Sequence, residues 1–244
     1  MKAAAVVTGH TRGLGAAIAE ELLTNDVFVH GLARGFNAEL AERFGGRLEQ
    51  TRLDLADAGA LTRWLQTDHM RQFFESATSA LLVNNAGLLK PIGPLETQGI
   101  TAVADAVTVN VAAPLMLSAA FIQATPDVPD RRILHISSGA GSSAYAGWSV
   151  YCATKAALDH HARAVALDDT RNLRVASVAP GVIDTDMQAE IRDTTIEHFP
   201  DRERFRHMKQ EGHLRTPRDA GQEMVEYLLG DAFGRDAVRD LRER

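Results

Sequence analysis

The sequence predicts an α/β protein, a single Rossmann-type domain over residues 1–244 with a doubly wound parallel sheet and helices on both faces. Short apolar runs alternate six times with helix-like stretches, which is the pattern of a parallel sheet with crossover helices. Nearly every apolar run ends in glycine or in small polar residues, and ligands bind at these strand ends in such sheets. No linker, repeat or low-complexity segment divides the 244 residues, a length within reach of one domain.

Composition limits the class of protein. Hydrophobic residues make up 45% and charged residues 24%, as in ordinary soluble domains, and the net charge of −6 argues against a nucleic-acid partner. The single cysteine excludes an internal disulfide and fits a reducing cytoplasm. The most apolar stretch, residues 103–124, contains Asp105 and Asn110, so we expect a buried helix and no membrane span. We expect no metal site, since His160 and His161 are adjacent and point in different directions.

The first β/α unit is typical of a phosphate-binding loop. An apolar strand over residues 2–7 leads into Gly9, Gly13 and Gly15, and a helix follows over residues 16–23. Glycine permits a positive φ and lets phosphate approach the main chain, and a helix N-terminus offers free N–H groups to an anion. The spacing G-x-x-x-G-x-G differs from the usual G-x-G-x-x-G fingerprint, so a structural turn without a ligand stays as the alternative.

Basic residues follow the second strand. Residues 27–33 form this strand, and Arg34 comes directly after it. In dinucleotide-binding folds an acidic residue at this place holds the adenosine ribose, whereas a basic one accommodates a 2′-phosphate. Arg12 in the glycine loop adds a second guanidinium, and the alternative is that both arginines are simply solvated. After the third strand, residues 46–53, Asp54 either meets the adenine end of a cofactor or begins a loop.

Two asparagine positions mark the middle of the chain. A fourth strand over residues 80–83 leads into residues 84–87, Asn-Asn-Ala-Gly, a turn that suits close approach of a ligand. Asn110 stands in an apolar setting before a helix over residues 111–124. Burying its amide unpaired costs about 1–3 kcal/mol. We therefore expect Asn110 to be either a structural bridge or a member of a proton relay.

Tyr151, Lys155 and Ser138 form the candidate catalytic group. Tyr151 and Lys155 are four apart on a predicted helix over residues 149–168 and share one face. A neighbouring ammonium favours the ionised phenol, and such a tyrosine can give a proton to a carbonyl oxygen or take one from an alcohol. Ser138 ends the fifth strand, where its hydroxyl could hold the same oxygen. The alternative is a surface Tyr and Lys on an ordinary helix.

The last third of the chain supplies a sixth strand, residues 173–178, and a candidate lid. Residues 180–185, Pro-Gly-Val-Ile-Asp-Thr, follow the strand. Residues 182–213 are charged and show no clear apolar period, so we expect a substrate lid that is mobile without substrate. Thr216 and Pro217 begin one more helix.

Six motifs in this order resemble the short-chain dehydrogenase/reductase family along nearly the whole chain: Thr8-Gly9-x-x-x-Gly13-x-Gly15, Asn84-Asn-Ala-Gly87, Asn110, Ser138, Tyr151-x-x-x-Lys155 and Pro180-Gly181-x-x-x-Thr185. The resemblance implies that Tyr151 is the acid/base and that Ser138 orients the substrate carbonyl. It implies that Lys155 binds the nicotinamide ribose and lowers the pKa of Tyr151, that Asn110 holds a relay water and that Thr185 holds the carboxamide. The implied cofactor is NADP(H), bound by Gly9, Thr11, Arg12, Gly13, Leu14, Gly15, Arg34, Asp54, Leu55, Asn84, Ala86, Gly87, Tyr151, Lys155, Pro180, Gly181, Ile183 and Thr185.

Within the family, residues 147–152 and 180–188 resemble the branch of sepiapterin and benzil reductases. Trp148 is the substrate contact that this branch suggests, and Asp240 is the candidate counterpart of the Asp that anchors the pterin in sepiapterin reductases. The flanking aromatic pattern around Asp240 is missing. We therefore expect an NADPH-dependent reductase of a ketone or diketone carbonyl. The alternatives are a pterin side-chain carbonyl reductase and a non-catalytic NADP(H)-binding sensor or scaffold.

The family resemblance also implies a homodimer or homotetramer, paired through the helix that contains Tyr151 and the one before it. Small residues on these helices would permit close packing between subunits, and would equally suit helices buried against their own sheet: Ala112, Ala113, Ala120, Ala156, Ala157 and Ala164.

Overall fold

The computed structural model describes residues 3–242 and contains one seven-stranded sheet in which all pairings are parallel. The strand order is β3-β2-β1-β4-β5-β6-β7, so the winding reverses between β1 and β4. The predicted doubly wound sheet is confirmed, and β7 is an addition that the polar tail did not predict. The strands are β1 (Ala3–Thr8), β2 (Phe28–Ala33), β3 (Leu48–Arg52), β4 (Ser79–Asn84), β5 (Asp130–Ile136), β6 (Leu173–Ala179) and β7 (Val238–Asp240).

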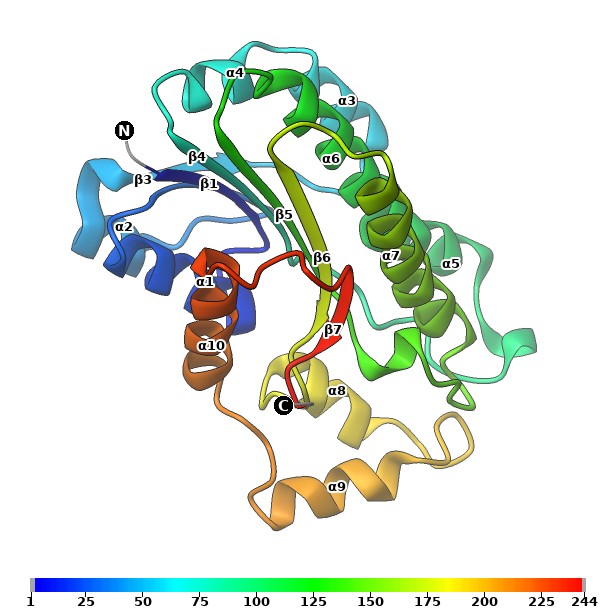
Figure 1. Cartoon of the computed structure of the whole chain (residues 1–244). Helices are drawn as coiled ribbons and strands as arrows, with labels where there is room; N and C mark the ends of the chain where they lie inside the picture. The colour runs from blue at the N-terminus through cyan, green and yellow to red at the C-terminus, as the bar shows by residue number, and fades with distance from the viewer. Residues whose placement is uncertain (1–2, 243–244) are drawn as a thin grey trace.

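Helices cover both faces of the sheet (Figure 1). Alternate residues of β1 enter the two cores, Ala5 and Val7 one and Ala4 and Val6 the other, as the strand period of two requires. The first core is closed by α1 (Gly13–Thr24), α2 (Ala38–Phe44) and α10 (Pro217–Leu229), and the second by α3 (Ala58–Leu65), α4 (His69–Phe74), α6 (Ala113–Ala124) and α7 (Ser149–Leu167). The expected N-cap of α10 is present, since the Asp219 N–H donates to Thr216 Oγ1 at 3.1 Å.

The most apolar stretch forms α5 (Ile100–Val107), a π-helical turn (Thr108–Ala112) and α6 in succession. Within residues 3–242 this is the one helix long and apolar enough to cross a membrane, a test that a core helix of a soluble protein also passes. The expectation of a buried helix over residues 103–124 is right for α6 but wrong for the end of α5, where Val107 is 44% exposed. The π turn places Asn110 at the position where α5 passes into α6, and such turns are frequent at functional sites.

The candidate lid is folded. It contains α8 (Asp186–Asp193) and α9 (Arg202–Gln210), which lie beyond the carboxyl end of β6 (Figure 1). Its apolar side chains Ile191, Phe199 and Phe205 are buried in a small third core with Trp148 and Tyr151. The segment therefore has its own packing despite its polar sequence.

Candidate active site

The glycine loop between β1 and α1 has a shape that side chains would prevent. Gly9 and Gly13 have φ values of +72° and +55°, which only glycine adopts readily. A Cβ at Gly15 would collide with the carbonyl oxygen of Gly9. The N-terminal N–H groups of α1 are thereby left next to open space, as anion binding at a helix N-terminus requires.

Thr8 fixes this loop to the end of β4. Its hydroxyl oxygen accepts the backbone N–H groups of Asn85 at 3.0 Å and of Ala86 at 2.9 Å. The Asn85 amide donates back to the Thr8 carbonyl at 2.9 Å. Two loops that are far apart in the sequence are thus held together where the sheet reverses its winding.

A cleft of about 1010 Å³ opens over the carboxyl ends of the strands. This is the location that doubly wound sheets use for ligands. Most of the predicted site residues line it: Gly9, Thr11, Arg12, Gly13, Leu14, Gly15, Arg34, Asp54, Leu55, Ala86, Gly87, Ser138, Trp148, Tyr151, Lys155, Pro180, Gly181, Ile183 and Thr185.

Three predicted residues lie outside the lining of this cleft: Asn84, Asp240 and Asn110, of which Asn110 is described below. Asn84 is the last residue of β4 and is aligned with His135 of β5. Its amide nitrogen is 3.1 Å from Nδ1 of that histidine and 3.4 Å from Ser118 Oγ. Asn84 therefore belongs to the interior, and Asn85 is the asparagine at the cleft. Asp240, on β7, accepts from Arg242 Nε at 2.9 Å, and it is Arg242 that reaches the cleft.

Ser138, Tyr151 and Lys155 meet at the floor of the cleft. The side chains of Tyr151 and Ser138 are hydrogen-bonded. Lys155 lies one turn further along α7, with its Nζ 5.7 Å from the centroid of the Tyr151 ring. Its ammonium donates to the Ile136 carbonyl oxygen at 2.7 Å. The residues come from the end of β5 and the beginning of α7, and the predicted spacing brings them together.

Burial controls the protonation of this group. It raises the pKa of Tyr151 to about 12, against a smaller lowering by the hydrogen bond from Ser138. The expected lowering of the Tyr151 pKa by Lys155 is therefore not seen in this structure, where burial has the largest effect. Burial lowers the pKa of Lys155 to about 8, while Asp159 acts to raise it. At neutral pH the site holds a neutral phenol and an ammonium.

Asp159 is a buried carboxylate that the sequence reasoning missed. It lies one turn beyond Lys155, and its Oδ1 accepts from Ser137 Oγ at 2.6 Å and from Ser177 Oγ at 2.7 Å. These bonds fasten α7 to β6 and to the residue that follows β5. The signal was present in the sequence, because residues 151, 155 and 159 share one helix face.

Asn110 is a structural bridge. Its Oδ1 accepts the Leu88 N–H at 2.7 Å, and its Nδ2 donates to the Leu88 carbonyl at 2.7 Å and to Thr154 Oγ1 at 3.1 Å. A Cβ at Gly87 would lie 3.5 Å from Asn110 Oδ1 and 3.8 Å from Lys155 Nζ. Asn110 and Lys155 therefore face the same small space, and its part in a relay stays a prediction.

The two predicted phosphate ligands differ in their surroundings. Arg34 is exposed at the edge of the cleft. Arg12 forms an ion pair with Asp186 at the start of α8, with 3.1 Å between Nη1 and Oδ2 and both side chains more than 70% exposed. An exposed pair of this kind contributes little free energy, so Arg12 can exchange this partner for a phosphate.

An aromatic wall closes the other end of the cleft, formed by Tyr145, Trp148, Phe199 and Phe205. Trp148 stacks on Phe199 with ring centroids 4.4 Å apart, and its ring is 5.5 Å from that of Tyr151. The side chains of Tyr145, Trp148 and Phe205 reach the cleft lining. Sequence reasoning found Trp148 but neither Tyr145 nor Arg242, since they come from segments without a regular pattern.

One of the two adjacent histidines, His161, packs against the interior. His161 is half-buried, and its Nδ1 lies 3.1 Å from Nε2 of the buried His135. His160 is exposed, whereas His161 belongs partly to the interior of the subunit. Residues 3–242 contain no group of three side chains that could hold a metal ion.

Comparison with known proteins decides the family. A model of the short chain dehydrogenase family matches residues 3–196. The chain belongs to this family. It is 33% identical over 245 residues to a benzil reductase ((S)-benzoin forming) of Bacillus cereus, covering 98% of both chains. It is 31% identical to a sepiapterin reductase of Meriones unguiculatus, covering 98% of this chain and 96% of the relative. A solved short-chain dehydrogenase/reductase from Burkholderia vietnamiensis is 48% identical, with a TM-score of 0.73 over 99% of this chain and 98% of that chain.

The short-chain dehydrogenase family and the branch expected from the motifs are thereby confirmed. The chain is an oxidoreductase of this family with relatives among both benzil and sepiapterin reductases.

Proposed function

We propose that the protein reduces a ketone or diketone carbonyl to an alcohol with NADPH, with Tyr151 as the proton donor. The observation that carries the proposal is the group of Ser138, Tyr151 and Lys155 at the floor of the cleft, in which Tyr151 and Lys155 are buried and Ser138 is half-buried. Reduction of a carbonyl requires a proton on the developing alkoxide, and a tyrosine whose pKa is about 12 carries that proton at neutral pH.

The cleft fits a dinucleotide. The glycine loop and the N-terminus of α1 suit a pyrophosphate, and the proposal of a 2′-phosphate is supported by Arg34, which lines the cleft directly after β2. When bound, the nicotinamide cofactor supplies the hydride. Ser138 and Tyr151 hold the carbonyl oxygen between their hydroxyls, and Tyr151 passes its proton to that oxygen. The positive charge of Lys155 stabilises the phenolate that remains, and the ammonium is placed to bind the ribose.

The aromatic wall supports an aryl ketone or an aryl diketone as substrate. Tyr145, Trp148 and Phe205 offer apolar ring faces beside Tyr151, and aromatic rings pack favourably against each other. The relative named benzil reductase acts on such a compound by its name.

A pterin is the second candidate, favoured by the sepiapterin reductase relatives. Against it, the Asp240 carboxylate is already engaged by Arg242. A scaffold without turnover has no need of the buried catalytic group.

A panel of ketones and diketones, including benzil and sepiapterin, tests the proposal through NADPH oxidation followed by absorbance. We expect turnover of at least one aryl diketone that Tyr151→Phe abolishes. A protein that binds NADPH but oxidises it with none of these carbonyls would contradict the proposal and favour the sensor or scaffold. The single cysteine remains the support for a cytoplasmic location.

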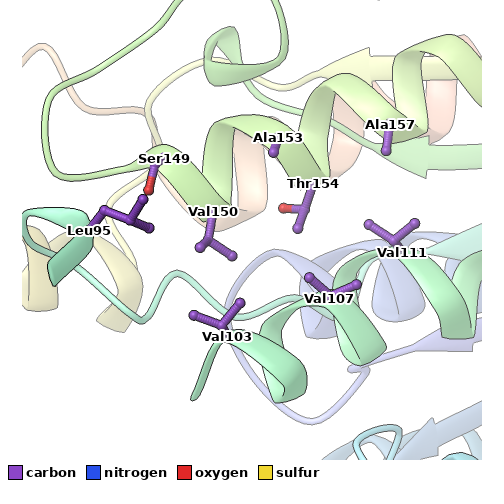
Figure 2. A pocket seen from close by; sticks show the side chains of 9 residues that line it. All are labelled: Leu95, Val103, Val107, Val111, Ser149, Val150, Ala153, Thr154 and Ala157. Atoms are coloured by element: carbon purple, nitrogen blue, oxygen red, sulfur yellow. The ribbon is translucent and has the colours of Figure 1, made fainter. Parts of the chain in front are cut away.

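We further propose a homodimer formed through α5 and α7. An apolar groove of about 440 Å³ runs between these helices, and Figure 2 shows their side chains facing each other across it. Leu95 and Val107 are exposed beside it, at 68% and 44%. Of the expected alanines, Ala157 lines the groove, whereas Ala113 is fully buried against its own sheet. Sedimentation at micromolar concentration should give at least a dimer, and Val107→Glu should give a monomer. A monomeric wild type would contradict this.

A further inference from the structure

His10 belongs to the glycine loop, yet no step of the proposed reaction uses it. The residue is fully buried. Its ring lies over Gly31 in β2, because a Cβ at position 31 would overlap the imidazole. Gly31 is aligned with Val7 of β1 and with Gln50 of β3. The missing side chain at position 31 therefore makes room on the sheet for a side chain from the glycine loop.

Gln50 connects His10 to the segment after β2. Its Oε1 lies 2.7 Å from His10 Nε2 and 2.6 Å from the backbone nitrogen of Asn37. A backbone N–H can only donate, so the Asn37 contact identifies the Gln50 atom as the oxygen. His10 Nε2 must then carry the hydrogen that it shares with this oxygen. One carbonyl oxygen thus receives a donor from each of the two loops.

Asn37 also fixes the beginning of α2. Its Oδ1 accepts the Leu40 N–H at 3.0 Å, which makes it the N-cap of that helix. The segment of residues 34–37 therefore follows directly from β2 at one end, and at the other end it is fixed by the hydrogen bonds of Asn37 to Gln50 and Leu40. Arg34 and Gly35, within this segment, line the cleft. The backbone path of residues 34–37 sets where the exposed Arg34 side chain begins, and so the region that its guanidinium can reach.

We propose that His10 is a positioning residue for cofactor selection, which through Gln50 holds the Arg34 segment where Arg34 meets the 2′-phosphate of NADPH. The inference rests on the proposed function, because it presupposes NADPH as the cofactor. NADH has no 2′-phosphate and gains nothing from the position of Arg34. Loss of the His10 hydrogen bond should therefore weaken NADPH binding much more than NADH binding.

The test compares two variants of similar size. His10→Leu fills the space but cannot donate, whereas His10→Gln keeps an N–H that can reach Gln50. Fluorescence titration gives the ratio of the NADH and NADPH dissociation constants, and thermal unfolding gives stability. We expect His10→Leu to lower the ratio about tenfold, which corresponds to about 1.4 kcal/mol, and His10→Gln to restore most of it. Hydrogen exchange over residues 34–37 should be faster in His10→Leu than in His10→Gln.

A double variant covers the case in which His10→Leu does not fold. In His10→Ala with Gly31→Ala the new methyl group at position 31 occupies space that the ring left, and no donor to Gln50 remains. It should show the same lowered ratio. A purely structural role would lower the melting temperature and leave the ratio unchanged, which would overturn the inference. A wild type without preference for NADPH would instead overturn the cofactor assignment, and the inference with it.

Discussion

The two ends of the cleft are built in different ways. At the proposed cofactor end, the site consists mainly of backbone, with Arg12 and Arg34 beside it: the glycine loop, the N-terminus of α1 and the turns after β4 and β6. At the substrate end, it consists of side chains from the aromatic wall, the lid helices and the tail after β7. A backbone site imposes glycine at fixed spacing, whereas a chamber of side chains imposes only bulk and polarity. The cofactor end can therefore be predicted from a single sequence, whereas the substrate end cannot.

The largest expected effect lies where the two ends meet. Tyr151→Phe keeps the buried ring and removes only the transferable proton, so the turnover number should fall about 10²–10⁴-fold. The dissociation constant for NADPH, measured by fluorescence, should stay the same. Lys155→Ala should impair both turnover and NADPH binding, because the ammonium acts at both. A Tyr151→Phe enzyme with half the wild-type activity would rule out Tyr151 as the proton donor.

The cofactor preference can be changed by substitutions that leave the substrate end of the cleft intact. Ala33→Asp with Arg34→Ala replaces the phosphate ligand by a carboxylate that repels it. Charge-assisted hydrogen bonds contribute about 1.5–3 kcal/mol each, so we expect the wild type to prefer NADPH by about a hundredfold or more and the double variant to lose that preference. Steady-state kinetics with both cofactors measures this. If Arg34→Ala weakened the binding of NADH and of NADPH equally, Arg34 would not be a ligand of the 2′-phosphate.

A smaller effect follows from the ionisation of Lys155. Its pKa is lowered to about 8, so the ammonium is lost as the pH rises through 8, and NADPH affinity should fall up to about tenfold by pH 9. Between pH 8 and the usual lysine value the unfolded chain binds more protons than the folded one. The free energy of unfolding should therefore rise with pH in this window, relative to Lys155→Met. Lys155→Arg stays charged, and its cofactor affinity should not change between pH 7 and pH 9.

The smallest effect concerns the substrate end. We expect residues 182–213 to gain hydrogen-exchange protection when cofactor and substrate are added. Phe199 is fully buried and Ile191 nearly so, so the gain should be larger in the exposed part of α9 than around these residues. Phe199→Ala would remove the stacking on Trp148 and should increase exchange throughout the lid. Identical protection with and without ligands would contradict a mobile lid.

The sheet and most of the candidate site could be predicted, because the residues that form the strand ends and the glycine loop are also those that would bind a ligand. Apolar runs and their small polar ends predicted the sheet, and Tyr151 with Lys155 followed from helix spacing. Asn84 was misplaced because the last residue of a strand and the first of a turn differ by one position, which reverses the direction of the side chain. The π turn was not predicted, since it has no local sequence pattern, and Asn110 within it bonds to the Leu88 backbone 22 residues earlier in the chain. The contact of Arg242 with the cleft depends on β7, whose three residues show no strand pattern.

The overlap between His10 and Gly31 has a consequence for how such a protein could evolve. A side chain gained at position 31 has no room while the imidazole is present, and removal of the imidazole alone leaves a gap over β2. The two positions are therefore expected to vary together among descendants of this sequence, although they are 21 positions apart in the chain. Of the two orders of substitution, the one that first shrinks residue 10 passes through a loosened but uncrowded intermediate. That order is the accessible mutational path.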